Sequence, residues 1–227
     1  MKARNMERQI AIKEAIFAER LLSWFSENKV SFPWRETADP YKIFVSEFLL
    51  RKTTRQQVSQ ICERFFSKYP DIEALSEATV KSIESTIVSL GMEHIRADAL
   101  KKIAKIVSEK YGGRIPDEKR SLMKLPHVGP YIANAVLCFA YGVDAPLLDT
   151  NVIRIISRVF SIKSARKRAR DDPKMWLAVH TLMPKGKSRD FNLALLDFAT
   201  SMCVPKNPKC SICPISDICD YYKPSRL

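Results

Sequence analysis

Four cysteines near the end of the chain have the residue type and spacing of a metal centre: Cys203, Cys210, Cys213 and Cys219. They are arranged as C-x6-C-x2-C-x5-C in the segment CVPKNPKCSICPISDIC. Zinc sites usually combine two C-x2-C pairs, whereas this segment has one such pair flanked by single cysteines at longer, unequal distances. The asymmetry favours an iron–sulfur cluster, which is held by four thiolates. A zinc site and buried thiols or disulfides are the alternatives that the spacing leaves open.

Two acidic residues occupy positions where an acid could do chemistry. Glu47 lies in the otherwise apolar stretch YKIFVSEFLLRKTT. Burial there would raise the pKa of its carboxyl group and leave it a proton donor near neutral pH, although a salt bridge to a buried cation is the simpler alternative. Asp149 precedes TNVIRI and on its own is typical of a helix N-cap. Its position, one helix length after a hairpin pattern, makes it a candidate site residue.

That hairpin pattern is the segment LPHVGPYIANAVL, residues 125–137. It predicts a tight turn and a new helix that starts at Gly129-Pro130. Without a side chain at Gly129, the backbone N–H groups of the helix start stay accessible to a phosphate oxygen, which the helix dipole also favours. Such a helix-hairpin-helix element grips one DNA strand without reading its sequence. His127 replaces the first glycine of the usual pattern, tolerates a left-handed backbone, and either contacts a phosphate or faces solvent.

The elements that must position these residues are helices, since the chain has only 6 Gly and no persistent alternation of apolar and polar residues. Asp39-Pro40 predicts a helix start, with a cap and a first-turn proline. Gly and Pro punctuation separates the expected helices, which cover about residues 9–25, 40–51, 53–68, 71–78, 80–90, 95–111, 117–124, 130–141, 150–160, 173–183 and 189–201. The basic run KSARKRAR, residues 163–170, is interpreted as a solvated loop.

Composition points to a polyanionic partner. The chain has 227 residues and a formal net charge of +13, and nucleic acid is the commonest partner for such a surplus. No stretch is long and apolar enough to span a membrane, and the charged start lacks a signal-peptide apolar region. We therefore expect an intracellular protein, cytoplasmic and nucleoid-associated in a prokaryote. In such a reducing compartment Cys62 and Cys138 are predicted to be small core residues.

Together these segments resemble the helix-hairpin-helix DNA glycosylase superfamily of endonuclease III and the adenine glycosylase MutY. The resemblance covers the chain from about Leu22 to Tyr222. Within the superfamily the chain is most similar to the Mig-type thymine-DNA mismatch glycosylases, which have LLRRTT and LPGVGKY where this chain has LLRKTT and LPHVGPY. The segments that carry the resemblance are PWR, DPYKIFVSEFLLRKTT, YGGRIP, LPHVGPY, LLDTNVIRI, DFNLALLDFA and the cysteine loop.

The resemblance implies a role for each matching residue. Asp149 falls on the catalytic aspartate, and Glu47 on the acid that protonates the leaving base in the adenine enzymes. Tyr131 falls where bifunctional members carry a lysine nucleophile, and a phenol cannot form the Schiff base that starts strand cleavage. Arg51 and Lys52 fall where other members have a wedge that fills the gap left by an extruded nucleotide. The implied mechanism is base flipping followed by hydrolysis of the glycosidic bond.

The implied architecture is an all-α, two-lobed fold. Residues 30–143 would form a six-helix barrel with the hairpin, and residues 1–29 plus 144–227 a second lobe. The four cysteines match the family's [4Fe–4S] loop, whose Lys206 and Lys209 would contact phosphates. We expect a monomer that excises thymine or uracil mispaired with guanine in double-stranded DNA. An adenine glycosylase acting on A:G or A:8-oxoguanine, and a non-catalytic iron–sulfur DNA-binding module, are the alternatives.

Overall fold

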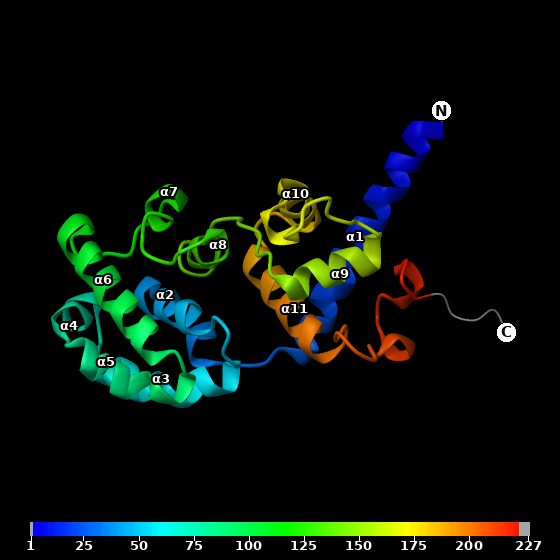
Figure 1. Ribbon diagram of the computed structural model, residues 1–227. Coiled ribbons are helices and arrows are strands. Elements are labelled where there is room, and N and C mark those ends of the chain that lie inside the picture. Colours follow the sequence, from blue (N-terminus) through cyan, green and yellow to red (C-terminus); the bar gives the residue numbers. More distant parts are fainter. Residues whose placement is uncertain (1, 223–227) are drawn as a thin grey trace. The chain divides into compact units, whose positions relative to one another are not determined.

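The computed structural model describes residues 2–222, so the outermost residues of the predicted second lobe, 1 and 223–227, lie outside the described part. The described residues form helices and turns without a strand, which confirms the all-α prediction. The α-helices are α1 (Lys2–Asn28), α2 (Pro40–Leu49), α3 (Arg55–Lys68), α4 (Ile72–Glu77), α5 (Val80–Ile87), α6 (Glu93–Tyr111), α7 (Lys119–Leu122), α8 (Pro130–Phe139), α9 (Thr150–Phe160), α10 (Pro173–Leu182) and α11 (Ser188–Ser201) (Figure 1). The 3-10 helices are η1 (Pro33–Arg35), η2 (Val88–Leu90), η3 (Ala169–Asp171), η4 (Cys210–Ile212) and η5 (Ser216–Ile218).

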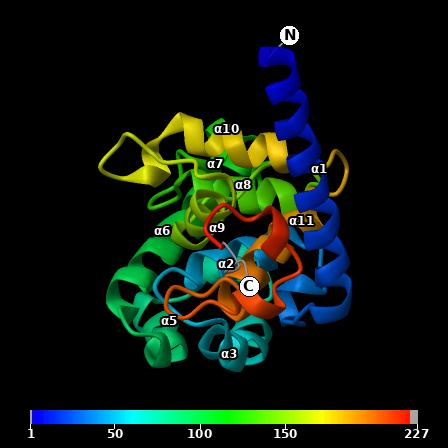
Figure 2. The ribbon, with the colours of Figure 1, turned by 90° about the vertical axis from the view of Figure 1, so that its right-hand side faces the viewer.

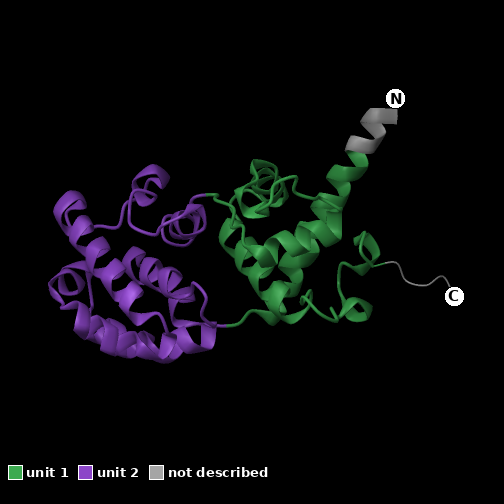
Figure 3. Cartoon of the chain, viewed as in Figure 1, with its two compact units in different colours: residues 1–30, 144–227 green, residues 31–143 purple. Residues whose placement is uncertain are grey.

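The chain divides into two compact units (Figure 3). Unit 1 consists of Met1–Val30 and Asp144–Leu227, and unit 2 of Ser31–Val143. The second unit is therefore inserted into the first along the sequence. Each unit has its own apolar core.

Unit 2 is built around α2 and α8, which pack against each other. Both helices are apolar on nearly every side, and such helices are stable only when they are buried. In α2 every residue from Ile43 to Leu49 is buried, and in α8 every residue from Ile132 to Phe139 is buried. The longer helix α6 packs on α4 and α5. The predicted start of α2 is confirmed, because the Asp39 carboxylate accepts a hydrogen bond from the Tyr41 backbone N–H at 2.9 Å.

Unit 1 is held together by α1 and α11, which lie side by side (Figure 2). Their contact is aromatic: the ring centroids of Trp24 and Phe198 lie 5.1 Å apart, edge to face. Phe17 on α1 makes the same kind of contact with Phe160 at 5.1 Å. Since a buried aromatic side chain removes a large apolar area from water, α1 is an integral part of the core that carries α9.

The smaller predictions about the chain agree with the structure. Cys62 and Cys138 are both buried, as expected of small core residues. The segment 163–168 is irregular, and its basic side chains are exposed, as a solvated loop requires. Among residues 2–222, no helix combines the length and the apolar character needed to cross a membrane.

Candidate functional site

Asp149 is the N-cap of α9 in unit 1, and three donors fix its carboxylate. Oδ1 accepts hydrogen bonds from the backbone N–H groups of Asn151 at 2.9 Å and Val152 at 2.8 Å. Oδ2 accepts from the Asn151 side-chain Nδ2 at 2.8 Å. The side chain is half-buried. The carboxylate thus has one orientation, set by the first turn of the helix.

Asn151 is in turn bonded to an arginine one helical turn later. Arg154 donates from Nη1 to the Asn151 Oδ1 at 3.0 Å. The same guanidinium donates from Nε to the Cys203 carbonyl at 2.9 Å and from Nη2 to the Ala199 carbonyl at 2.8 Å. Sequence reasoning missed both Asn151 and Arg154. The available signal was their spacing, since residues three apart lie on one face of a helix.

The cysteine loop leaves the end of α11 and folds back over α9. Arg158, one turn beyond Arg154, donates to the carbonyls of Val204 at 2.7 Å and Pro205 at 2.9 Å. Its Nη1 also lies 3.5 Å from the Cys203 Sγ. The loop therefore receives donors from one face of α9, the face that begins beside Asp149.

One cavity is lined by all four cysteines of the loop: Cys203, Cys210, Cys213 and Cys219. The side chains of Arg158, Phe198 and Ile215 also line it. Within residues 2–222, no three or more His, Cys, Asp or Glu side chains are arranged to hold a single metal ion. A zinc ion needs four ligand atoms at about 2.0–2.3 Å from one point. Four cysteine side chains around one cavity are the donor set by which proteins bind an iron–sulfur cluster.

Burial in the cysteine loop favours the neutral thiol of Cys213 over its thiolate. Desolvation raises the pKa of the Cys213 thiol to about 11. Because a metal ligand must be the thiolate, binding of iron has to displace that proton.

In unit 2 the predicted hairpin is present between α7 and α8. His127 has a φ of 60°, the left-handed conformation that histidine was expected to tolerate. The Val128 N–H donates to the Leu125 carbonyl at 3.2 Å and closes the turn. Gly129 is the N-cap of α8, without a side-chain cap, and a Cβ added there would meet nothing within 4 Å. No side chain therefore occupies the space beside Gly129, at the start of α8.

The other candidate residues of unit 2 lie on α2, on α8 and on the turn after α2. Glu47 is buried, with 4% of its surface exposed, and Tyr131 is half-buried in the first turn of α8. Arg51 and Lys52 are exposed, and Lys52 has a left-handed φ of 56°. Arg51 donates to the His127 carbonyl at 3.2 Å and lies 5.5 Å from the Phe48 ring centroid. The structure therefore links Arg51 to the hairpin, a contact that the sequence did not predict.

Lys206 and Lys209 are exposed on the cysteine loop of unit 1. The Lys209 N–H donates to the Met202 carbonyl at 3.1 Å, so this lysine is tied by its backbone to the end of α11. Unit 1 thus carries Asp149 and the cysteine loop with its lysines, and unit 2 carries Glu47, Tyr131, Arg51, Lys52 and the hairpin.

Two family models match this chain. Residues 45–176 match the HhH-GPD superfamily base excision DNA repair protein model. Residues 203–219, the stretch from the first cysteine to the last, match the iron-sulfur binding domain of endonuclease III.

The chain is also similar to individual DNA glycosylases over most of its length. It is 46% identical to a thymine-DNA glycosylase of Aeropyrum pernix, over 89% of this chain and 92% of that one. It is 38% identical to a thymine/uracil-DNA glycosylase of Methanothermobacter thermautotrophicus, over 93% and 95% of the two chains. The solved structure of a thermostable thymine-DNA glycosylase superposes with a TM-score of 0.88 at 38% identity, covering 92% of this chain and 96% of that one.

Proposed function

Because the chain belongs to the HhH-GPD superfamily of base excision DNA repair proteins, as its sequence segments predicted, we propose that it is a DNA glycosylase without strand-cleaving activity that removes thymine and uracil mispaired with guanine. The observation that carries the proposal is the fixed carboxylate of Asp149, in a chain that is 46% identical to a thymine-DNA glycosylase over 206 residues. Double-stranded DNA is then the partner that the charge of +13 indicates.

Asp149 stabilises the transition state through its charge. As the bond between the sugar C1′ and the base nitrogen breaks, the electron pair leaves with the base and positive charge builds on the sugar. An oriented carboxylate stabilises that charge without reorganising. Water then adds through its oxygen to C1′, and its proton passes to the base or to solvent. The products are a free base and an uncut abasic site.

Tyr131 is the reason why the DNA strand should stay uncut after the base has left. Strand cleavage by a glycosylase starts when an amine attacks C1′ and forms a Schiff base. The phenol of Tyr131 carries no amine, so the abasic product should stay intact. The substitution Tyr131→Lys places an amine at this position and should introduce a covalent adduct that borohydride traps.

The iron–sulfur group is inferred to be a [4Fe–4S] cluster bound by Cys203, Cys210, Cys213 and Cys219. When bound, it supplies a cross-link among these four residues. The loop that it would hold presents Lys206 and Lys209, and in unit 2 the absence of a side chain at Gly129 leaves room for a phosphate at the start of α8. These contacts fit the backbone of DNA, which positions a protein without specifying sequence.

An adenine glycosylase is the second candidate, and the burial of Glu47 favours it. A carboxyl group with 4% exposure is suited to protonating a departing adenine. In the thymine and uracil reaction the same group would hydrogen-bond the leaving base.

A duplex-incision assay separates these functions. Duplexes with T:G, U:G, A:G or A:8-oxoguanine are incubated with the protein and then analysed with and without hot alkali. We expect breaks in T:G and U:G duplexes, and only after alkali. Faster processing of A:G would replace the thymine assignment by the adenine one, and breaks without alkali would disprove the absence of strand cleavage. Binding without excision of any base would indicate a non-catalytic DNA-binding module.

Asp149→Asn tests the role of the charge within the same assay. We expect it to bind mismatched DNA normally and to lose roughly 3 kcal/mol or more of transition-state stabilisation. The amide can keep the backbone cap through its oxygen, but its nitrogen then faces the Asn151 Nδ2, which is also a donor. Full activity of this variant would exclude a catalytic role for the charge of Asp149.

A further inference from the structure

Arg96 is a nearly fully buried arginine close to the start of α6, with 5% of its surface exposed. Its guanidinium makes four hydrogen bonds, all to neutral oxygens. Nε donates to the Gly91 carbonyl at 2.9 Å, and Nη1 donates to the Leu49 carbonyl at 2.9 Å. Nη2 donates to the Arg51 carbonyl at 2.5 Å and to the Thr53 Oγ1 at 2.7 Å.

These acceptors belong to two turns on either side of the guanidinium. One turn follows α2 and contains Lys52, and the other precedes α6 and contains Met92. Both residues are left-handed, with φ values of 56° and 54°, and both are exposed. Non-glycine residues adopt this conformation only when surrounding contacts impose it. Bonds to the carbonyls next to both residues supply such contacts.

Burying the charged guanidinium of Arg96 costs free energy, because all four of its hydrogen bonds go to neutral oxygens. Burial, and secondly the charge of Arg51, lower the pKa of this guanidinium. A buried charge is tolerated when its hydrogen-bonding capacity is met. Here three backbone carbonyls and one hydroxyl accept from the guanidinium, and the carbonyls of Leu49 and Arg51 lie at the carboxyl end of α2, where the helix dipole also favours a cation.

A third turn is connected through Arg51. Its backbone carbonyl accepts from Arg96, and its own Nη1 donates to the carbonyl of His127 in the hairpin at 3.2 Å. One continuous path therefore runs from the turn at Met92, through Arg96 and Arg51, to the hairpin that ends at Gly129. All of these residues belong to unit 2.

We propose that Arg96 is a positioning residue that holds these three turns as one preformed surface for the DNA strand around an extruded nucleotide. The proposal rests on the proposed glycosylase function. Loops that are already ordered bind without the entropic cost of ordering them in the complex. Arg96 itself is buried and touches no DNA. Its effect should therefore appear in the extrusion of the base, and the chemistry that follows should be unaffected.

The first test needs no enzyme activity. The turn after α2 contains two trypsin sites, at Arg51 and Lys52. We expect Arg96→Met to speed cleavage at these two sites by roughly tenfold or more, the scale of one lost hydrogen bond to a charged group. Cleavage in the exposed loop 163–170 should stay unchanged. Arg64→Met is the control, because Arg64 donates to the Thr86 carbonyl at 2.6 Å in the same unit and its loss removes none of the four bonds of Arg96.

A milder variant covers the case in which Arg96→Met does not fold. Thr53→Val keeps the shape of the side chain but removes one acceptor of Arg96 and one donor to the Arg51 carbonyl. It should speed cleavage at the same two sites by a smaller factor. If either folded variant is cut there no faster than Arg64→Met, Arg96 does not hold the turn and the proposal is overturned.

The second test locates the effect in base extrusion. Excision of thymine is measured in a T:G duplex and in a duplex with thymine opposite an abasic site, where extrusion costs less. We expect the Arg96→Met variant to lose roughly tenfold in the first duplex and to recover most of that loss in the second. Equal losses in both duplexes would overturn the positioning role. If the wild-type protein excises no thymine, the proposed function fails, while the proteolysis still reports on the turns.

Discussion

The Nε of Arg154 donates a hydrogen bond to the carbonyl oxygen of Cys203 at 2.9 Å, and this bond joins the middle of α9 to the first cysteine of the loop. The same guanidinium holds the Asn151 amide, and that amide holds the Asp149 carboxylate. The orientation of the catalytic candidate and the conformation of the cysteine loop are therefore linked through two side chains within one unit.

The link predicts a catalytic defect in Asn151→Ala. This change removes the donor to the Asp149 Oδ2 and leaves the two backbone donors to Oδ1 in place. We expect a loss of about 1.5–3 kcal/mol of transition-state stabilisation, the size of one hydrogen bond to a charged group. Single-turnover excision of a T:G mismatch measures it, and affinity for DNA should stay the same.

Thr150→Ala is the matched control for this variant, because Thr150 is the exposed neighbour in the same helical turn. It should excise at the wild-type rate. An Asn151→Ala protein that is as fast as this control would show that the backbone bonds alone orient Asp149.

Removal of a cluster ligand should unfold the loop that carries the lysines. Purified protein is expected to be brown and to contain iron, and Cys210→Ser should lose both the colour and much of the affinity for DNA. Iron analysis of anaerobically prepared protein and a binding titration measure the two effects. Cys62→Ala, which removes a buried thiol of unit 2, should keep its iron. Stoichiometric zinc without iron in the wild type would contradict the cluster assignment.

If Lys206 and Lys209 contact phosphates, replacing them should weaken the dependence of DNA binding on salt. Each phosphate contact contributes about 0.9 to the slope of log K against log salt, so replacing both lysines by Ala should flatten it by roughly two units. Matched and mismatched duplexes should lose affinity alike. The double change Lys163→Ala and Lys167→Ala in the basic loop serves as the control, with a smaller effect expected. A loss confined to mismatched DNA would mean that the lysines read a base.

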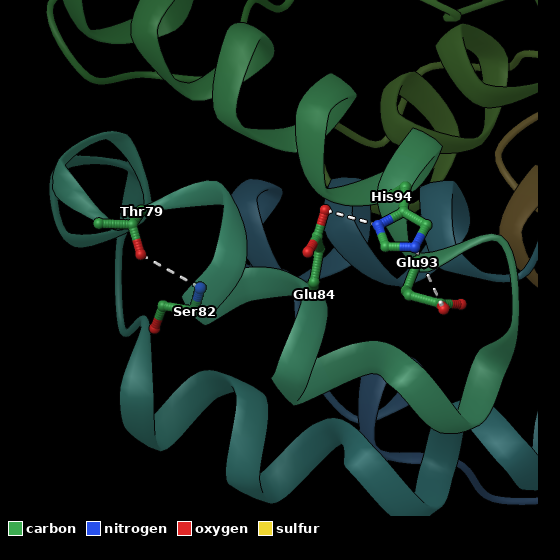
Figure 4. Close-up of polar contacts among 5 residues, drawn as sticks. All are labelled: Thr79, Ser82, Glu84, Glu93 and His94. Carbon is green, nitrogen blue, oxygen red and sulfur yellow. Dashed lines mark hydrogen bonds and ion pairs between the residues drawn. The ribbon is translucent and has the colours of Figure 1, made fainter.

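The ion pair of His94 with Glu84 predicts a pH-dependent contribution to stability. His94 lies at the start of α6, and its Nδ1 is 2.9 Å from the carboxylate of Glu84 on α5 (Figure 4). This hydrogen bond raises the pKa of the imidazole. The contribution is fully present below the pKa of the unfolded state and is lost as the pH rises through the higher pKa of the folded state.

Glu84→Gln should therefore lower the pKa of His94 in an NMR titration. Its urea midpoint should fall below that of the wild type in acidic solution and approach it at alkaline pH. A difference that stays constant across the titration would show that the ion pair is not its origin.

The sequence predicted much of this fold because its signals are local. Asp39-Pro40 marks a helix start through its cap and its fixed φ, and the cysteine spacing marks the loop. The bonds of Arg96 and Arg154 were not predictable in this way. Arg96 contacts a residue 47 positions away and Arg154 one 49 positions away, through backbone carbonyls that every residue possesses. No periodicity or composition encodes such a contact.

Both bounds of the first helix differ from the prediction. The apolar spacing of the first helix predicted residues 9–25, whereas α1 begins at Lys2 and ends at Asn28. The apolar pattern marks only the part of a helix that faces the core, so it gives shorter bounds than the helix itself has.

The insertion of unit 2 into unit 1 sets the order in which the nascent protein can mature. Helix α1 leaves the ribosome first, but its partner α11 begins at Ser188, after all of unit 2 has been made. At about 5–20 residues per second this delay is on the order of ten seconds or more. During that time Phe17 lacks its contact with Phe191 of α11, whereas residues 31–143 are complete before α11 is synthesised. The four cysteines follow α11 in the chain, so a cluster bound by them could form only after both segments of unit 1 have been synthesised.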